Sequence, residues 1–290
     1  MTGRLFAWLQ HLLPARWISV LARRVSNSRL LARPMIAIVR RLYRIELDEY
    51  QVPEPGFASF DQFFTRPLKA GARNWPDDPD IITSPCDGRI SQLGSAEDGR
   101  LLQAKGRHYR LDALLADPDW ARRLTGGQFL TVYLAPSDYH RVHMPFAGRL
   151  LREIRVPGSL YSVSESSVQH IDRLFARNER MVALFETRHG PAAVVMVAAL
   201  LVSGIETRWG GPLRPGPTPA VRDFPTPLSL ERGEELGRFH WGSTVIVITA
   251  PGAPRWRPEL EPGLRLRLGQ PLTGADHQAA PGNPRPPAGV

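Results

Sequence analysis

Cysteine is almost absent from this chain of 290 residues, in which Cys86 is the only example. A single thiol excludes an internal disulfide framework and any zinc site built from cysteines. The flanking residues, Pro85 and Asp87, bring no positive charge that would lower the pKa of the thiol. The sequence therefore gives little support to a cysteine hydrolase, and nothing in it demands an oxidising compartment.

Acidic residues are absent from positions 1–44, a segment that contains nine arginines. The rest of the chain holds 28 basic and 28 acidic residues, so the net charge of +9 belongs to this amino-terminal segment alone. A nucleic-acid-binding protein more often spreads its arginines over the folded surface. The charge distribution therefore argues against a nucleic-acid partner.

Long apolar runs are also lacking. In the amino-terminal segment the runs at 17–22 and 34–39 have about six residues, whereas a membrane-spanning helix needs about 20. Arginine is mixed there with Leu, Ile, Val, Phe and Trp at helical spacings, which predicts two or three amphipathic helices broken near Pro14 and Pro34. Such helices lie in an anionic membrane interface. The alternative is a helical cap on the protein's own core.

Short runs of β-forming residues, separated by turn residues, fill the chain from about residue 53 onward. The clearest lie at 87–94, 99–111, 126–136, 148–158, 180–209 and 243–252. Segment 111–124 predicts a helix, and the Pro/Gly-rich segment 210–227 predicts a long loop.

These patterns predict an α+β fold, in which a predominantly antiparallel β domain carries peripheral helices and an amphipathic helical leader. We expect the leader at 1–52, the β domain at 53–272 and a disordered tail at 273–290.

The first group of candidate catalytic residues lies in "APSDYHRVHMPFAG" (135–148). This segment places Asp138, His140 and His143 in a loop after a strand. A metal site would need a third ligand, and no nearby carboxylate has a convincing spacing, so no metal is expected. A purely structural role for one of the two histidines stays open. Asp87, in "SPCDGRI" (84–90), has the place of an ordinary turn aspartate before a strand.

Ser243 stands directly after Gly242, at the entry of an apolar strand over 244–249. The nucleophile elbow of an ordinary lipase has a glycine two residues either side of the serine, a pattern that is missing here. A glycine immediately before the serine leaves the preceding carbonyl uncrowded. The serine hydroxyl can therefore attack its own peptide bond.

Seven blocks of the sequence together resemble the bacterial phosphatidylserine decarboxylases. In chain order they are "FDQFFTRPLKAGAR", "SPCDGRISQLG", "LLQAKGRHYRLDALL", "YLAPSDYHRVHMPFAG", "LFARNERMVALFET", "VSGIETRW" and "GRFHWGSTVIVI". The resemblance runs from about residue 56 to about 272. The family's cleavage motif is commonly Leu-Gly-Ser-Thr, and this chain has Trp241 in place of the leucine.

The resemblance implies that the chain cleaves itself between Gly242 and Ser243. The Ser243 hydroxyl would attack the Gly242 carbonyl, and β-elimination would then break the chain without water. The products would be a β chain, 1–242, and an α chain, 243–290, whose first residue becomes a pyruvoyl group. By the same resemblance His143 is the base.

The resemblance also assigns Asp87 to orient that base, and it makes the pyruvoyl group the only cofactor, with no metal and no pyridoxal phosphate. The serine amine of phosphatidylserine would form a Schiff base with the group, which would accept the electrons released with CO₂. His140 is expected to supply a proton or hold the lipid carboxylate. Pyridoxal phosphate would need a lysine, and the chain has only Lys69 and Lys105.

The implied activity is decarboxylation of phosphatidylserine to phosphatidylethanolamine by a peripheral protein on the cytoplasmic side of the cell membrane. Its partners would be the anionic membrane surface and, within the heterodimer, its own α and β chains. Two alternatives stay open at this point. One is a pyruvoyl-dependent decarboxylase of a soluble amino acid, and the other is a noncatalytic protein that binds membrane surfaces.

Overall fold

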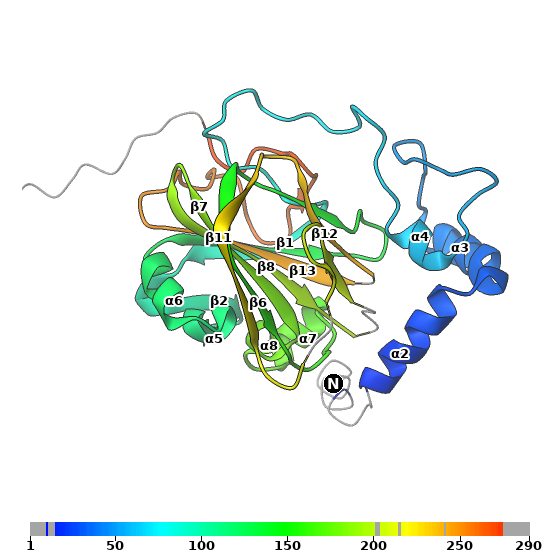
Figure 1. Ribbon diagram of the computed structural model, residues 1–290, viewed down its shortest axis with the longest axis horizontal. Coiled ribbons are helices and arrows are strands. Elements are labelled where there is room, and N and C mark those ends of the chain that lie inside the picture. Colours follow the sequence, from blue (N-terminus) through cyan, green and yellow to red (C-terminus); the bar gives the residue numbers. More distant parts are fainter. Residues whose placement is uncertain (1–9, 11–14, 201–203, 214–215, 241, 275–290) are drawn as a thin grey trace, which may run out of the picture.

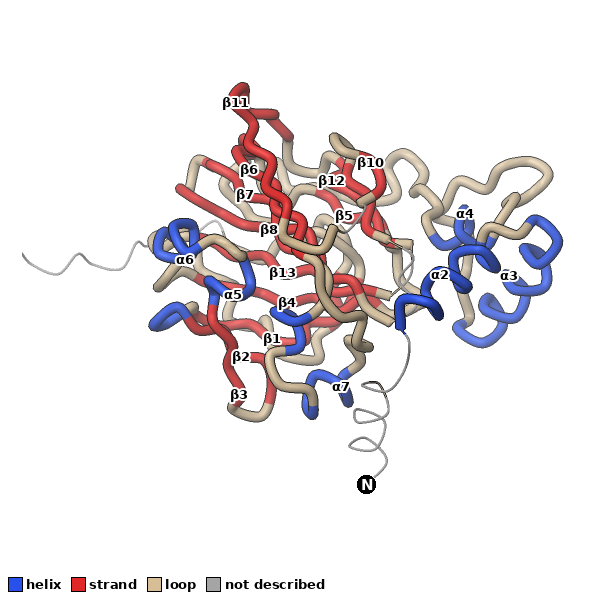
Figure 2. Tube along the Cα trace, turned by 60° about the horizontal axis from the view of Figure 1, so that its bottom comes forward, coloured by secondary structure: helices blue, strands red, loops and turns tan. Residues whose placement is uncertain are grey.

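A computed structural model describes residues 10, 15–200, 204–213, 216–240 and 242–274. Its centre is a large sheet, with helices α5 and α6 on one side and helices α2, α3 and α4 gathered at the opposite end (Figures 1 and 2). The helices are α2 (Ala15–Ser26), α3 (Arg29–Tyr43), α4 (Phe60–Phe64), the 3₁₀ turn η1 (Glu97–Gly99), α5 (Leu111–Leu115), α6 (Pro118–Leu124), α7 (Glu165–His170) and α8 (Leu174–Arg177).

The large sheet has eight strands in the order β11-β6-β7-β8-β13-β4-β1-β14, and every neighbouring pair is antiparallel. Its strands are β1 (Gly88–Ser95), β4 (Gln128–Leu134), β6 (Gly148–Val156), β7 (Arg180–Thr187), β8 (Gly190–Ala198), β11 (Ala220–Leu230), β13 (Ser243–Thr249) and β14 (Arg265–Leu266). The expected α+β fold with a predominantly antiparallel sheet is confirmed.

Two smaller sheets complete the fold. The first has the order β10-β9-β12-β5, and the second is the hairpin β2-β3. Their strands are β2 (Arg100–Ala104), β3 (Arg107–Arg110), β5 (Arg141–His143), β9 (Ile205–Thr207), β10 (Gly211–Pro212) and β12 (Glu235–Phe239).

Strand β13 lies in the middle of the large sheet. It pairs over its whole length with β8 on one side and β4 on the other, and all seven of its residues are buried. A continuous apolar run such as Val245–Ile248 is what a strand covered on both faces requires. Ser243 opens this strand and is paired with Leu134 and Ala198.

The described part of the leader forms helices α2 and α3, but the predicted break at Pro34 is wrong, and the break predicted near Pro14 lies outside the described residues. Helix α3 runs through Pro34, and the described break falls at Asn27-Ser28. The proline removes one hydrogen bond within the helix. Packing of Met35, Ile36 and Val39 against a cluster that includes α4 outweighs that loss.

Two further local predictions need correction. The helix expected over 111–124 is two short helices, because Ala116 adopts a left-handed conformation and Asp117 caps α6 through its side chain. The loop expected over 210–227 is partly strand. Strand β11 pairs with β6 at the edge of the sheet, where Pro225 and Pro227 can be accommodated because an edge strand need not donate on its outer side.

The packing extends across both of the boundaries expected at 52 and 273. Tyr50 is buried and bridges to Leu68, and the hydroxyl of buried Thr273 accepts a hydrogen bond from the Ile82 amide. The rest of the expected tail, 275–290, lies outside the described residues. Within the described part of the chain, no helix is long and apolar enough to cross a membrane.

Candidate active site

Ser243 is fully buried at the head of β13, and its hydroxyl has no hydrogen-bond partner among the described residues. A buried hydroxyl without a partner is costly and uncommon in folded proteins. Its backbone is fixed on both sides by the pairs with Leu134 and Ala198. The Ser243 backbone is therefore held on both sides, while its hydroxyl oxygen has no hydrogen-bond partner in the described part of the chain.

Gly242, directly before it, is half-buried, and a Cβ added there would meet none of the described atoms within 4 Å. The space beside the Gly242 Cα is therefore open. The preceding position, Trp241, lies outside the described residues.

His143 lies at the end of β5, and both of its ring nitrogens are engaged. Nδ1 is 2.7 Å from the carbonyl oxygen of Gly233, and Nε2 is 3.1 Å from the hydroxyl of Tyr139. Because a carbonyl only accepts, Nδ1 carries the hydrogen and Nε2 accepts from the tyrosine. Burial lowers the pKa of His143, against the opposing effect of the Gly233 carbonyl, so the ring is a neutral imidazole with its lone pair on Nε2.

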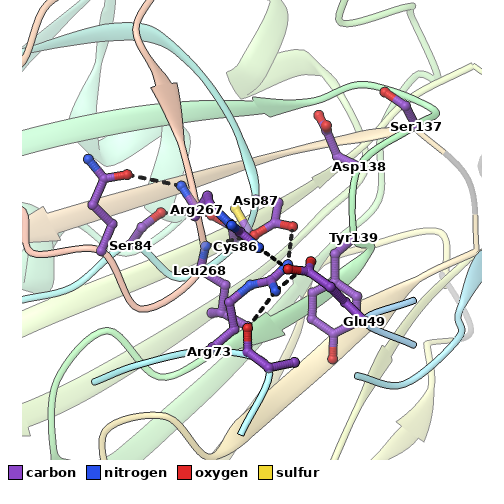
Figure 3. A network of polar contacts seen from close by, with 12 residues as sticks. Glu49, Arg73, Ser84, Cys86, Asp87, Ser137, Asp138, Tyr139, Arg267 and Leu268 are labelled. Carbon is purple, nitrogen blue, oxygen red and sulfur yellow. Dashed lines mark hydrogen bonds and ion pairs between the residues drawn. The ribbon is translucent and has the colours of Figure 1, made fainter. Parts of the chain in front are cut away.

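Asp87 lies just before β1 and belongs to a different network, shown in Figure 3. One carboxylate oxygen accepts from the Leu268 amide at 2.7 Å, and the other accepts from Arg73 at 2.7 Å. Arg73 also donates to Glu49 at 2.8 Å. Desolvation lowers the pKa of Arg73, but its two carboxylate partners outweigh that and raise the pKa overall. Asp87 is therefore held as an ion-paired carboxylate.

His140 is fully buried and stacked on Phe64 of α4, with 3.9 Å between the ring centroids. Its Nε2 donates to the carbonyl of Ala135 at 3.0 Å, while its Nδ1 has no partner among the described residues. Burial, with the nearby Arg66 guanidinium, lowers its pKa to about 3. His140 therefore offers a buried lone pair and must take up a proton before it can deliver one.

Asp138 closes the loop that carries both histidines. It accepts from the Ala135 amide at 2.8 Å and from Arg265 at 2.9 Å. Burial raises the pKa of Asp138, against the opposing effect of these two donors. Asp138 therefore caps the loop through the Ala135 amide.

Asp87, His143 and Ser243 make no hydrogen bonds with one another in the described part of the chain. The group that fixes the tautomer of His143 here is the Gly233 carbonyl, with Tyr139 on the other nitrogen. Sequence reasoning missed both residues. Tyr139 stands inside the quoted "DYHRVH" motif, whereas a backbone carbonyl 90 residues away leaves no signal in the sequence.

A pocket of about 340 Å³ opens beside His143. Its lining combines aromatic and cationic side chains, among them Lys69, Arg73, Trp75, Tyr139 and Arg141. No group of three or more His, Cys, Asp or Glu residues suited to a metal ion occurs within the described ranges.

Acid should destabilise the fold through His140. A buried imidazole whose pKa is lowered from 6.5 to about 3 is neutral in the folded state, so the unfolded chain binds its proton first as the pH falls. This contribution to stability is complete above the unfolded pKa and is lost below it, by about 3 kcal/mol between about pH 7 and pH 4.5.

Thermal unfolding of an uncut Ser243→Ala chain at these two pH values measures the effect. Adding His140→Gln should shrink the acid-induced fall in Tm by about 5–10 °C. An equal fall with and without His140→Gln would show that this histidine does not control acid stability.

Comparison with known families identifies the family of this chain. A family model described as "Phosphatidylserine decarboxylase" matches residues 60–274, a range that contains every candidate site residue named above. The chain belongs to the phosphatidylserine decarboxylase family.

Its curated relatives cover nearly the whole chain. It is 44% identical to a phosphatidylserine decarboxylase proenzyme of Ectopseudomonas mendocina, over 95% of this chain and 99% of the relative. It is 46% identical to the proenzyme of the same name from Azotobacter vinelandii, over 93% and 98%. The corresponding Stenotrophomonas maltophilia proenzyme is 45% identical over 91% and 96%. All three relatives are named as proenzymes.

Proposed function

We propose that this protein decarboxylates phosphatidylserine to phosphatidylethanolamine and CO₂, after converting its own Ser243 into a pyruvoyl group. The observation that carries the proposal is the buried, unengaged hydroxyl of Ser243 directly behind an open Gly242. The names of the relatives supply the substrate and the precursor character.

Ser243 is suited in two respects to become the pyruvoyl group. Its Oγ can form a bond to the Gly242 carbonyl carbon as the peptide C–N bond breaks, which gives an ester. Elimination then removes the Ser243 α-proton and breaks the Cβ–Oγ bond, leaving Gly242 as a carboxylate and residue 243 as dehydroalanine. Water converts this into the pyruvoyl group with loss of ammonia.

Ser243 is also suited because residue 243 keeps its position in the sheet after the chain is cut. Strand β13 is paired along both edges with strands of the other chain product, so the two products stay together as a heterodimer. The pyruvoyl group supplies an electron sink for the carbanion left when CO₂ departs.

His143 is the base in this proposal. Its neutral Nε2 can accept the Ser243 proton once the ring exchanges the Tyr139 hydroxyl for that of Ser243. Asp87 contributes a fixed negative charge near the ring, which favours the protonated state that the transfer creates. Its direct partner remains Arg73.

The pocket beside His143 suits the polar head of the lipid. Lys69, Arg73 and Arg141 line it, the two arginines already paired with carboxylates, and the head group carries both a phosphate and a carboxylate. A soluble amino acid lacks the phosphate. CO₂ release should therefore be measured on dispersed phosphatidylserine and on free serine at equal concentration. Release from the lipid alone supports the proposal, and faster release from serine contradicts it.

We also propose that the leader holds the protein at the cytoplasmic surface of the cell membrane. Helix α3 exposes a stripe of apolar side chains on the side away from α4, namely Leu30, Leu31, Ile38 and Leu42. The exposed fractions of Leu30, Ile38 and Leu42 are 90%, 64% and 69%. Arginines flank this stripe, a combination that favours the interface of an anionic bilayer.

Binding to anionic vesicles should depend on that stripe. The double variant Ile38→Glu with Leu42→Glu should sediment with vesicles at least tenfold more weakly, because it places charge where apolar area would be buried. High salt should weaken binding of the unaltered chain by screening the arginines. These variants are sharper than removal of the leader, which would uncover the apolar cluster around Phe60 and Phe63.

Val221→Glu is the matched control, because Val221 is also apolar and 55% exposed but lies on β11. It should bind vesicles like the unaltered chain. Loss of binding in this control, with normal binding of the double variant, would place the anchor on β11 instead.

A further inference from the structure

His240 lies just before the proposed cleavage site, directly after β12 and two residues before Gly242. The backbone around it is fixed from two directions. The Phe239 amide donates to the carbonyl of His140 at 2.9 Å, and the His240 amide donates to the carbonyl of Gly204 at 3.1 Å.

The side chain of His240 bridges two carboxylates. Its Nδ1 is 2.8 Å from Asp61 of α4, and its Nε2 is 3.2 Å from Glu206 of β9. Each ring nitrogen of His240 therefore faces a carboxylate oxygen on a different element of the fold. The three side chains are mostly buried, with exposed fractions of 17–25%. Hydrogen bonds to an ionised carboxylate are of the stronger kind.

The two carboxylates are themselves held in place. Asp61 lies in the first turn of α4, whose amino terminus is capped by the Ser59 hydroxyl. Glu206 also faces Arg238 of β12 at 3.4 Å, and Arg238 pairs in turn with Glu235 at 3.4 Å. Arg238 and His240 thus connect the end of β12 to carboxylates of α4 and β9, elements far apart in the sequence.

We propose that His240 is a positioning residue for self-cleavage, and that its bridge to Asp61 and Glu206 holds the segment upstream of the scissile bond. This inference rests on the proposed function. Downstream of the bond, β13 fixes Ser243 by pairing on both sides. Upstream, Gly242 has no side chain, and His240 is the described side chain nearest to the scissile bond that is hydrogen-bonded to other elements. Attack by a serine on its own preceding carbonyl needs both sides restrained, because a small misplacement of reacting atoms costs much of the rate.

The test follows self-cleavage of the full chain made by cell-free translation, sampled over time on a denaturing gel. His240→Ala should cut about tenfold more slowly than the unaltered chain, and Asp61→Asn and Glu206→Gln should each slow the cut by several-fold. His240→Arg places a guanidinium with several donors between the two carboxylates, so it should restore the rate to within about threefold. The matched control is His108→Ala, which removes an exposed histidine on β3 and should leave cleavage unchanged.

Two further readouts separate positioning from a merely structural role. Once His240→Ala has been fully cut, its CO₂ release per pyruvoyl group should be close to normal, and its Tm in an uncut Ser243→Ala background should change little. Cleavage of His240→Ala at the unaltered rate would overturn the inference. So would slow cleavage that His240→Arg does not rescue, or slow cleavage that follows a large fall in Tm. Failure of the unaltered chain to cut would instead overturn the proposed function.

Discussion

Ser243→Ala should remain one uncut chain and release no CO₂ from phosphatidylserine. Without the hydroxyl, nothing on residue 243 can attack the Gly242 carbonyl, so the loss should be complete and not partial. Ser243→Cys retains a nucleophile at the same point of β13 and should still cut, more slowly. Gel mobility and CO₂ release report the two consequences separately.

Thr249→Val is the matched control for this change. Thr249 ends the same strand, is equally buried, and also has a hydroxyl without a partner among the described residues. Replacement by valine should therefore leave cleavage and activity intact. Normal cutting and activity of Ser243→Ala would contradict the pyruvoyl proposal outright.

The two histidines should separate the two reactions. His143→Ala should slow self-cleavage by about 100-fold or more, because the base is removed, and activity should be lost with it. His140→Ala should still cut, yet its CO₂ release per pyruvoyl group should fall by about 100-fold. A gel and a CO₂-release assay on each variant measure both steps.

His140 is fully buried against Phe64, so alanine there leaves a cavity that could impair folding. His140→Gln keeps most of the volume and should give the same separation of cleavage from turnover. If the His140 variants stay uncut while His143→Ala is cut normally, then His140 is the base for cleavage and His143 acts in decarboxylation. Normal cleavage in both would exclude either ring as the base.

The strands could be predicted from the sequence, and Gly242-Ser243 could be proposed as the scissile pair, because both signals are local. Val245–Ile248 is an uninterrupted apolar run, and the glycine before Ser243 has its consequence within one peptide bond. The prediction of a helix break at Pro34 was wrong because the interaction that decides it is not local. The force that keeps α3 continuous is its packing on residues 45–64, which no local rule contains.

The hydrogen-bond partners of the site residues could not be predicted from the sequence, for a related reason. The Gly233 carbonyl on His143 and the Arg73 guanidinium on Asp87 reach their partners only after the sheets have formed. The same holds for His240, whose two carboxylates stand 179 and 34 residues away from it. The sequence shows the histidine in "GRFHWGST", but the carboxylates that its side chain contacts are known only from the fold.

Intact mass analysis of the purified protein under denaturing conditions tests the central claim most directly. The account predicts two chains that split between Gly242 and Ser243, with the smaller one carrying a ketone in place of its amino terminus and therefore blocked to Edman sequencing. A single chain with the full mass of all 290 residues would contradict it. A smaller chain that begins with an ordinary serine amine would contradict it equally, since that result means hydrolysis without a pyruvoyl group.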